Sequence, residues 1–170
     1  MAKLTQFPTL TNSEADAAKT SGLTIVGGRA QILVVDDDRA FCETIAKCLA
    51  QRGYDVVCAD GGEAAAEAIA EQKPDLIVTD VMMPGMDGID LINWLHDNAI
   101  DVPVIAISGE GLVGRDGEAG DMPKMQLCDR NGGRAAAAAL GAVSVLQKPF
   151  GRTTLEGAVA QALVHGAVMH

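Results

Sequence analysis

The sequence predicts an α/β domain in which a five-stranded parallel sheet is covered by helices on both faces. Two observations lead to this prediction. Five short apolar runs alternate with stretches of helical periodicity, and such alternation is typical of parallel strands joined by crossover helices. The chain has 170 residues and is 48% apolar, which is enough for the core of one domain.

Each expected element follows from a local pattern. The strands are short, largely apolar runs, and the helices place apolar residues three or four positions apart, as at Phe41, Ile45 and Cys48. In chain order, the expected elements are the strand Ile32–Val35, the helix Arg39–Gln51, the strand Val56–Ala59, the helix Gly62–Gln72, the strand Leu76–Thr79, a helix carrying Ile89, Ile92 and Leu95, the strand Val104–Ile107, the helix Arg134–Leu140, the strand Val143–Leu146 and a last helix that runs to about Val168.

Residues that start or stop helices lie at several expected boundaries. Gly53 follows the first helix and is expected to end it. Two later helices are expected to start with capping boxes, Asp60 with Glu63 and Thr153 with Glu156, because an acid three residues after the cap can reach back to it.

Two segments fall outside the alternation. Residues 1–30 are rich in Thr, Ser, Ala and Gly and are expected to form a flexible tail, so the domain is expected over residues 31–168. Residues 109–134 hold seven glycines and few large apolar groups. They predict an insertion over about 109–131, between the fourth strand and the fourth helix.

Charge and composition exclude several classes of protein. With 13 basic and 23 acidic residues, the net charge is −10, which argues against a nucleic-acid partner because such proteins need a basic face. Aromatic residues make up only 3% of the chain, so stacking platforms for bases are not expected. The four cysteines form no CxxC pair, which favours reduced thiols rather than a zinc site. No signal peptide or membrane span is visible, and a cytoplasmic location is expected.

Polar side chains follow four of the expected strands. Asp36 and Asp37 come after the first strand, Asp80 after the third, Ser108 after the fourth, and Lys148 shortly after the fifth. The carboxyl ends of parallel strands meet at one edge of the sheet, so these groups are expected to converge. A lone Asp at such a junction is often only a helix cap, but five placed groups together indicate a site.

Three clustered carboxylates need a cation, since like charges raise one another's pKa. Lys148 supplies one positive charge, and Mg²⁺ is the simplest further cation because it takes oxygen ligands. A carboxylate beside Mg²⁺, a lysine and a hydroxyl is a phosphoryl-transfer site in which the carboxylate becomes an acyl phosphate.

Three segments carry a specific resemblance: Ile32–Asp37, Leu76–Gly88 and Lys148–Phe150. Over about residues 31–168 the chain resembles the receiver domain of bacterial two-component response regulators, of the single-domain chemotaxis type. The resemblance implies a flavodoxin-like fold with five helices and the strand order 2-1-3-4-5.

The resemblance also implies a role for each site residue. Asp80 is the phosphoacceptor, and Asp36 and Asp37 hold Mg²⁺ together with Asp80 and the backbone carbonyl of Met82. Lys148 contacts the phosphoryl group, and its bond to Pro149 is expected to be cis. Ser108 occupies the hydroxyl switch position, and Met82 and Glu110 lie at positions that tune dephosphorylation.

Two features depart from this family. Val145 stands where the family usually has a switch aromatic, which puts the usual coupling of Ser108 to the last strand in question. The insertion begins with a GxGxxG pattern at residues 109–114, which binds a dinucleotide only where a helix begins. A long loop and a partner-binding or lid element are the alternatives for this segment.

The expected function is that of a single-domain response regulator: a phosphoacceptor in a phosphorelay, not an enzyme beyond Mg²⁺-dependent self-phosphorylation and slow self-dephosphorylation. The expected partners are a sensor histidine kinase or a histidine phosphotransfer protein and an unknown downstream protein. The alternatives are a pseudo-receiver that acts as a scaffold and an aspartyl-phosphate hydrolase. The hydrolase needs a second Asp at the position of Met82.

Overall fold

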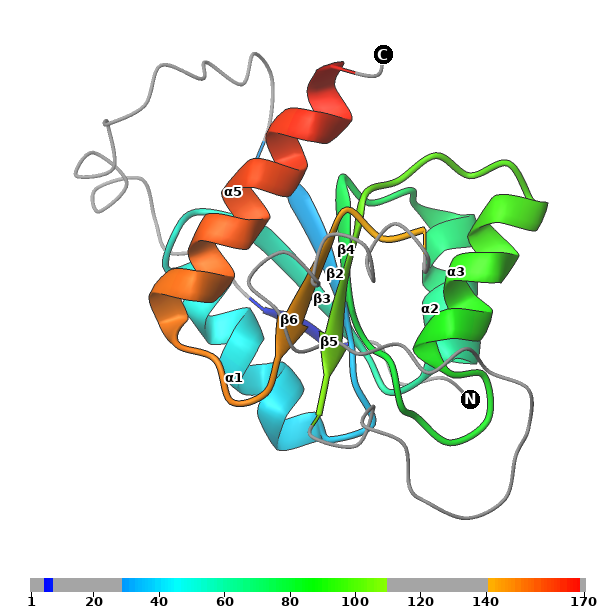
Figure 1. The fold of residues 1–170 in the computed structure, drawn as a ribbon, viewed down its shortest axis with the longest axis horizontal. Helices are drawn as coiled ribbons and strands as arrows, with labels where there is room; N and C mark the ends of the chain where they lie inside the picture. The colour runs from blue at the N-terminus through cyan, green and yellow to red at the C-terminus, as the bar shows by residue number, and fades with distance from the viewer. Residues whose placement is uncertain (1–4, 8–28, 110–140, 169–170) are drawn as a thin grey trace.

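A computed structural model describes residues 5–7, 29–109 and 141–168. Its centre is a six-stranded sheet in the order β1-β3-β2-β4-β5-β6, seen nearly edge-on in Figure 1. The strands are β1 (Thr5–Phe7), β2 (Gln31–Val35), β3 (Asp55–Ala59), β4 (Leu76–Asp80), β5 (Val104–Ser108) and β6 (Ser144–Gln147).

The five strands from β2 onward are parallel and have the predicted order 2-1-3-4-5 when counted among themselves. Every residue of β4 and β5 is buried, as expected of strands covered on both faces. The predicted flavodoxin-like α/β class is therefore confirmed, and all five parallel strands end at one edge of the sheet.

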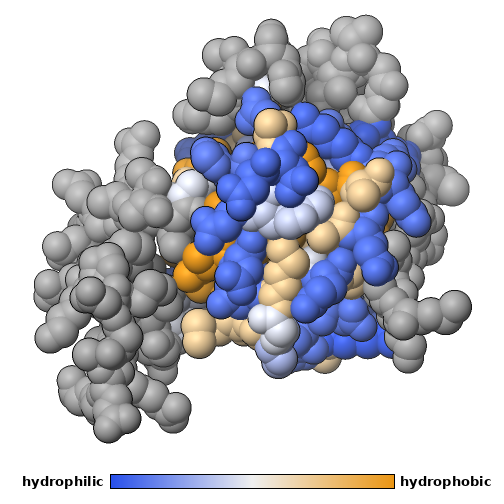
Figure 2. All heavy atoms as spheres, turned by 90° about the vertical axis from the view of Figure 1, so that its right-hand side faces the viewer, coloured by the Kyte–Doolittle hydropathy of each residue, from blue (hydrophilic) through white to orange (hydrophobic). Residues whose placement is uncertain are grey.

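Helices cover both faces of this sheet. In Figure 1, α1 (Arg39–Ala50) and α5 (Arg152–Val168) lie on one face, and α2 (Gly62–Glu71) and α3 (Gly88–Asp97) lie on the other. Successive strand residues alternate between the two cores: Ile32 and Val34 pack toward the first pair of helices, Leu33 and Val35 toward the second. Hydrophilic residues predominate on the outer face of α2 and α3 (Figure 2).

Four helices lie in the described residues, against five predicted. The fourth predicted helix, Arg134–Leu140, lies outside the described residues, as does nearly all of the predicted insertion at 109–131. No helix within the described ranges is long and apolar enough to cross a membrane.

Strand β1 was not predicted. It lies within the segment 1–30 that was expected to be a tail, and it pairs antiparallel with β3, with Thr5 opposite Cys58 and Phe7 opposite Val56. The run Thr5–Phe7 is too short to show a period of two, so the sequence carried no strand signal there.

Both predicted capping boxes are wrong. Helix α2 has Gly61 at its N-cap with no side-chain hydrogen bond, and the Glu63 carboxylate instead accepts from the N–H of Met86. Helix α5 begins at Arg152, so Thr153 lies inside it and is not the cap, and Glu156 pairs with Arg52 and Arg152. The side chains that cap helices are Asp38 at α1 and Asp87 at α3.

Candidate functional site

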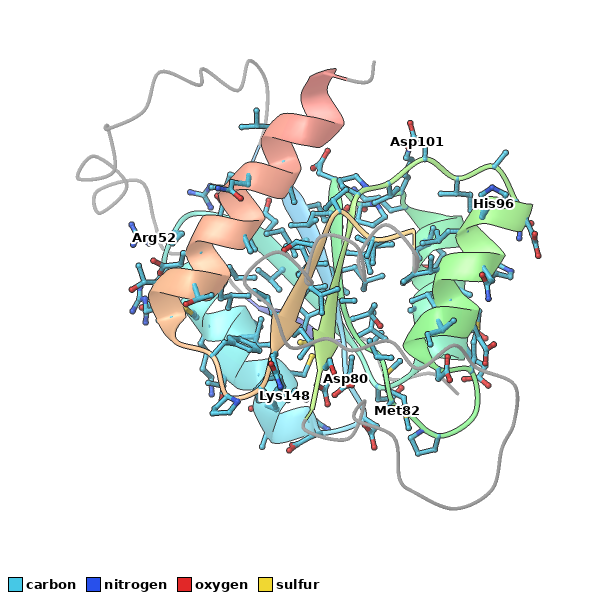
Figure 3. All side chains as sticks on the ribbon, viewed as in Figure 1. Arg52, Asp80, Met82, His96, Asp101 and Lys148 are labelled. Carbon is cyan, nitrogen blue, oxygen red and sulfur yellow. The ribbon has the colours of Figure 1, made fainter. Side chains whose placement is uncertain are left out.

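The predicted site residues come from the carboxyl ends of four strands. Asp36 follows β2, Asp80 ends β4, Ser108 ends β5, and Lys148 follows β6. Figure 3 shows Asp80 and Lys148 side by side at this end of the sheet, while His96 and Asp101 lie at the opposite end. The crossover connections therefore gather residues that are far apart in the sequence.

An ion-pair triad forms the centre of the site. The Lys148 ammonium donates to Asp80 Oδ2 at 2.5 Å and to Asp36 Oδ2 at 3.1 Å. The second oxygen of each carboxylate accepts a backbone N–H: Asp36 Oδ1 from Asp38 at 2.8 Å and Asp80 Oδ1 from Met82 at 2.9 Å. Both carboxylates are buried, with Asp36 2% and Asp80 7% exposed, so their orientations are fixed by these donors.

Burial and charge act in opposite directions on this triad. Burial raises the pKa of the Asp36 carboxyl, against the lowering effects of the Asp38 N–H and of Lys148. Burial alone would lower the pKa of Lys148, but its hydrogen bonds to Asp80 and Asp36 outweigh that effect and raise it. The lysine therefore stays charged at neutral pH, next to carboxylates that are poorly hydrated.

One aromatic ring of α1 contacts the lysine, and a second ring packs against the first. The Lys148 ammonium lies 4.1 Å from the centroid of the Phe41 ring, within the range of a cation–π contact. Phe150 meets Phe41 edge-on, with 6.0 Å between ring centroids. In the sequence, Phe41 is one apolar position of a helical pattern, and that periodicity gives no signal for a contact with Lys148.

Two glycines let the loop between β4 and α3 approach the site. A Cβ at Gly88 would lie 2.1 Å from the Asp80 carbonyl oxygen, and one at Gly62 would lie 2.4 Å from the Met86 carbonyl oxygen. Glu63 holds the same loop through Met86 N–H at 3.1 Å. The loop that carries Met82 is thus fixed by backbone contacts that no other residue type allows at Gly88.

The remaining predicted site residues take no part in the triad. Asp37 follows Asp36 and is exposed, and the Met82 side chain is 63% exposed. Ser108 is buried, but its hydroxyl donates to the carbonyl of Gly109 at 3.0 Å rather than to a carboxylate. Val145 packs with the core on the α2 and α3 face. Glu110 lies outside the described residues.

The acidic residues fit a hard divalent cation by their chemistry. Asp36, Asp37 and Asp80 carry three negative charges against one on Lys148, which leaves −3 + 1 = −2. Within the part of the chain that is described, no three His, Cys, Asp or Glu side chains are placed so that they could hold a metal ion together. Mg²⁺ does not need three such ligands, because it keeps several waters and uses one or two carboxylates.

Comparison with known proteins gives one family. A family model described as the response regulator receiver domain matches residues 32–119, slightly more than half of the chain. Response regulator MprA of Mycolicibacterium vanbaalenii is 39% identical over 100 residues, which cover 55% of this chain and 43% of that protein. MprA of Mycobacterium ulcerans is 40% identical over 100 residues, with coverages of 55% and 43%. The chain thus matches less than half the length of these relatives.

Solved structures give the same fold. The receiver domain of Francisella response regulator 1452 is 27% identical, with a TM-score of 0.64 over 81% of this chain and 98% of that one. The receiver domain of NtrX from Brucella abortus is 26% identical, with a TM-score of 0.62 over 78% and 97%. The cis bond between Lys148 and Pro149 that the resemblance implied is also present.

Proposed function

Because this chain belongs to the response regulator receiver family of two-component signalling, we propose that it is a phosphoacceptor, phosphorylated on Asp80 in the presence of Mg²⁺. The observation that carries the proposal is the triad, in which Lys148 bridges the buried carboxylates of Asp80 and Asp36. The Asp80 carboxylate can act as the nucleophile, and the Lys148 ammonium can neutralise charge on the transferred group.

In the proposed step, an Asp80 oxygen attacks the phosphorus of a phosphohistidine. The new O–P bond forms as the N–P bond breaks, and the departing imidazole nitrogen takes up a proton. The Met82 N–H, 2.9 Å from Asp80 Oδ1, holds the carboxylate in place during the attack. Lys148 then neutralises charge on the phosphoryl oxygens.

Asp36, Asp37, Asp80 and the Met82 backbone carbonyl are the proposed Mg²⁺ ligands. When bound, the ion would neutralise negative charge on the phosphoryl group. Asp37 is exposed, so its carboxylate can reach an ion that keeps its waters.

We assign Ser108 to a phosphoryl oxygen. Its hydroxyl now donates to the Gly109 carbonyl, so this role requires a rotation about one side-chain bond. Ser108 ends β5, and the residue before it, Ile107, lies opposite Asp80 in the sheet register, which puts the hydroxyl at the same sheet edge as the phosphoacceptor.

The proposed upstream partner is a sensor histidine kinase or a histidine phosphotransfer protein, and the proposed output is contact with a downstream protein. The net charge of −10 supports protein rather than nucleic-acid or membrane partners. We place this exchange in the cytoplasm, because Cys42, Cys48 and Cys58 are free thiols.

A pseudo-receiver without phosphorylation is the second candidate. Val145 favours it, because a valine there cannot act as the family's aromatic switch. The complete triad favours the phosphoacceptor. The hydrolase has less support, because Met82 offers no general acid at the position where that chemistry needs one.

Mass spectrometry after incubation with acetyl phosphate and Mg²⁺ tests the proposal. The wild-type chain should gain about 80 Da, the mass of one phosphoryl group, and Asp80→Asn should gain nothing. Asp101→Asn is the matched control, because Asp101 is exposed at the opposite end of the sheet (Figure 3). An unmodified wild type would favour the scaffold, and a modified Asp80→Asn would exclude Asp80 as the acceptor.

A further inference from the structure

Strand β1 adds an element that the family match does not include. The match begins at residue 32, whereas β1 spans Thr5–Phe7 and pairs with β3. Among the parallel strands, β3 is the outermost on this side, and β1 covers its free edge. The same strand also lies against α1.

The backbone register shows which groups of β3 face that edge. The N–H of Asp55 donates to the Ala30 carbonyl, and the Ala59 carbonyl accepts from Asp36 N–H, so these residues face β2. Backbone groups alternate along a strand, so Val56 and Cys58 face the opposite way, toward β1. Their register partners are Phe7 and Thr5.

The outer edge of β3 could pair with another chain if it were left open. Between Asp55 and Asp60 the sequence is Val-Val-Cys-Ala, with no charged residue and no proline. An apolar edge such as these four residues of β3 is a template for pairing with another chain. Residues 8–30, 23 in number, join β1 to β2.

We propose that the outer edge of β3 is a docking surface for an extended peptide strand, and that residues 5–7 of the same chain are its occupant. Binding uses the main-chain groups of Val56 and Cys58, in the manner of strand addition. Residues 5–7 thus belong to the sheet, and they block pairing of two copies through β3. This inference does not depend on phosphorylation of Asp80.

Amide hydrogen exchange, measured residue by residue by NMR, tests the proposal on a chain that lacks residues 1–8. The amides of Val56 and Cys58 should exchange at least about tenfold faster than in the full chain. The Val57 amide faces β2 and is the internal reference, so its exchange should not change. Equal exchange of Val56 and Cys58 in both chains, with Val57 also unchanged, would overturn the proposal.

A pair of proline variants tests it in the full chain. Thr5 faces β3, so Thr5→Pro removes an N–H from the ladder, whereas the N–H of Gln6 points away and Gln6→Pro leaves the ladder intact. Only Thr5→Pro should speed exchange at Cys58. The same effect from both variants, or from neither, would contradict the register on which the proposal rests.

A rescue experiment tests the occupant. A synthetic peptide of residues 1–10, added to the shortened chain, should restore protection at Val56 and Cys58 with a saturable dependence on its concentration. A peptide of the same composition in scrambled order is the control for sequence. Failure of the native peptide at millimolar concentration would show that residues 5–7 are not the occupant.

Discussion

Two charged clusters in this molecule share a layout but differ in burial. At the sheet edge, one lysine lies between the carboxylates of Asp36 and Asp80. On the outside of α1 and α5, one carboxylate, Glu156, lies between the guanidinium groups of Arg52 and Arg152. Figure 3 shows Arg52 at the outer side of the molecule, away from Asp80 and Lys148.

The two clusters differ in how well water can hydrate their charged groups. The Asp36 side chain is 2% exposed, and burial raises its pKa. The Arg52 and Arg152 side chains are 51% and 54% exposed, and their hydrogen bonds lower the pKa of Glu156 to about 2. The outer cluster leaves its excess charge in solvent, whereas the inner one keeps uncompensated negative charge inside the protein. That uncompensated negative charge would attract a cation such as the proposed Mg²⁺.

Replacing Lys148 should have the largest effect on this comparison. Lys148→Met removes the bridging charge, so phosphorylation by acetyl phosphate should slow at least about 100-fold. Mg²⁺ should bind several-fold tighter, because a competing cation is gone. Timed mass spectrometry of the phosphorylated chain and a Mg²⁺ titration measure the two quantities. Lys47→Met, an exposed lysine on α1, is the control, and weaker Mg²⁺ binding in Lys148→Met would contradict the charge argument.

Removing the ring beside the lysine should have an intermediate effect. Phe41→Leu keeps the apolar volume but loses the cation–π contact at 4.1 Å, so phosphorylation should slow by roughly 2- to 10-fold. Phe41→Tyr keeps the ring face and should restore the rate. If Tyr and Leu slow the reaction equally, Phe41 only fills space and does not position Lys148.

Breaking the outer cluster should have the smallest effect. Glu156→Gln should lower the melting temperature slightly at pH 7 and leave phosphorylation unchanged. The folded-state pKa of about 2 lies below the ordinary value of 4.5, so this carboxylate stabilises the fold above the ordinary pKa and loses that effect as pH falls toward 2. Melting curves of wild type and variant should therefore converge between about pH 5 and pH 2. A constant difference would exclude the ion pairs as its cause.

Much of the sheet could be predicted because its signals are local. Apolar runs locate β2 to β6, and the rule that parallel strands end together predicts that Asp36, Asp80 and Lys148 meet, as the triad shows. The order of strands came from resemblance and is confirmed. The ligand set for Mg²⁺, the role of Ser108 and the single-domain output stay predictions.

The rest depended on contacts between residues far apart in the sequence. The spacing of Thr153 and Glu156 suggested a local cap, but Glu156 pairs with Arg152 and with Arg52, which is 104 residues away. Phe41 fitted a helical apolar face, and its contact with Lys148 exists only once β6 lies beside α1. Strand β1 forms by pairing with the free edge of β3, and the sequence around Thr5 gives no sign of that pairing.

Asp38 connects the site to a helix in a way that constrains both. Its backbone N–H donates to Asp36 Oδ1, while its side chain accepts from the N–H groups of Ala40 and Phe41 at the start of α1. The direction of the helix axis and the orientation of the Asp36 carboxylate are therefore set together. A protein that tilted α1 on binding would therefore turn the Asp36 carboxylate relative to Lys148, and the rate of the proposed phosphorylation would change with it.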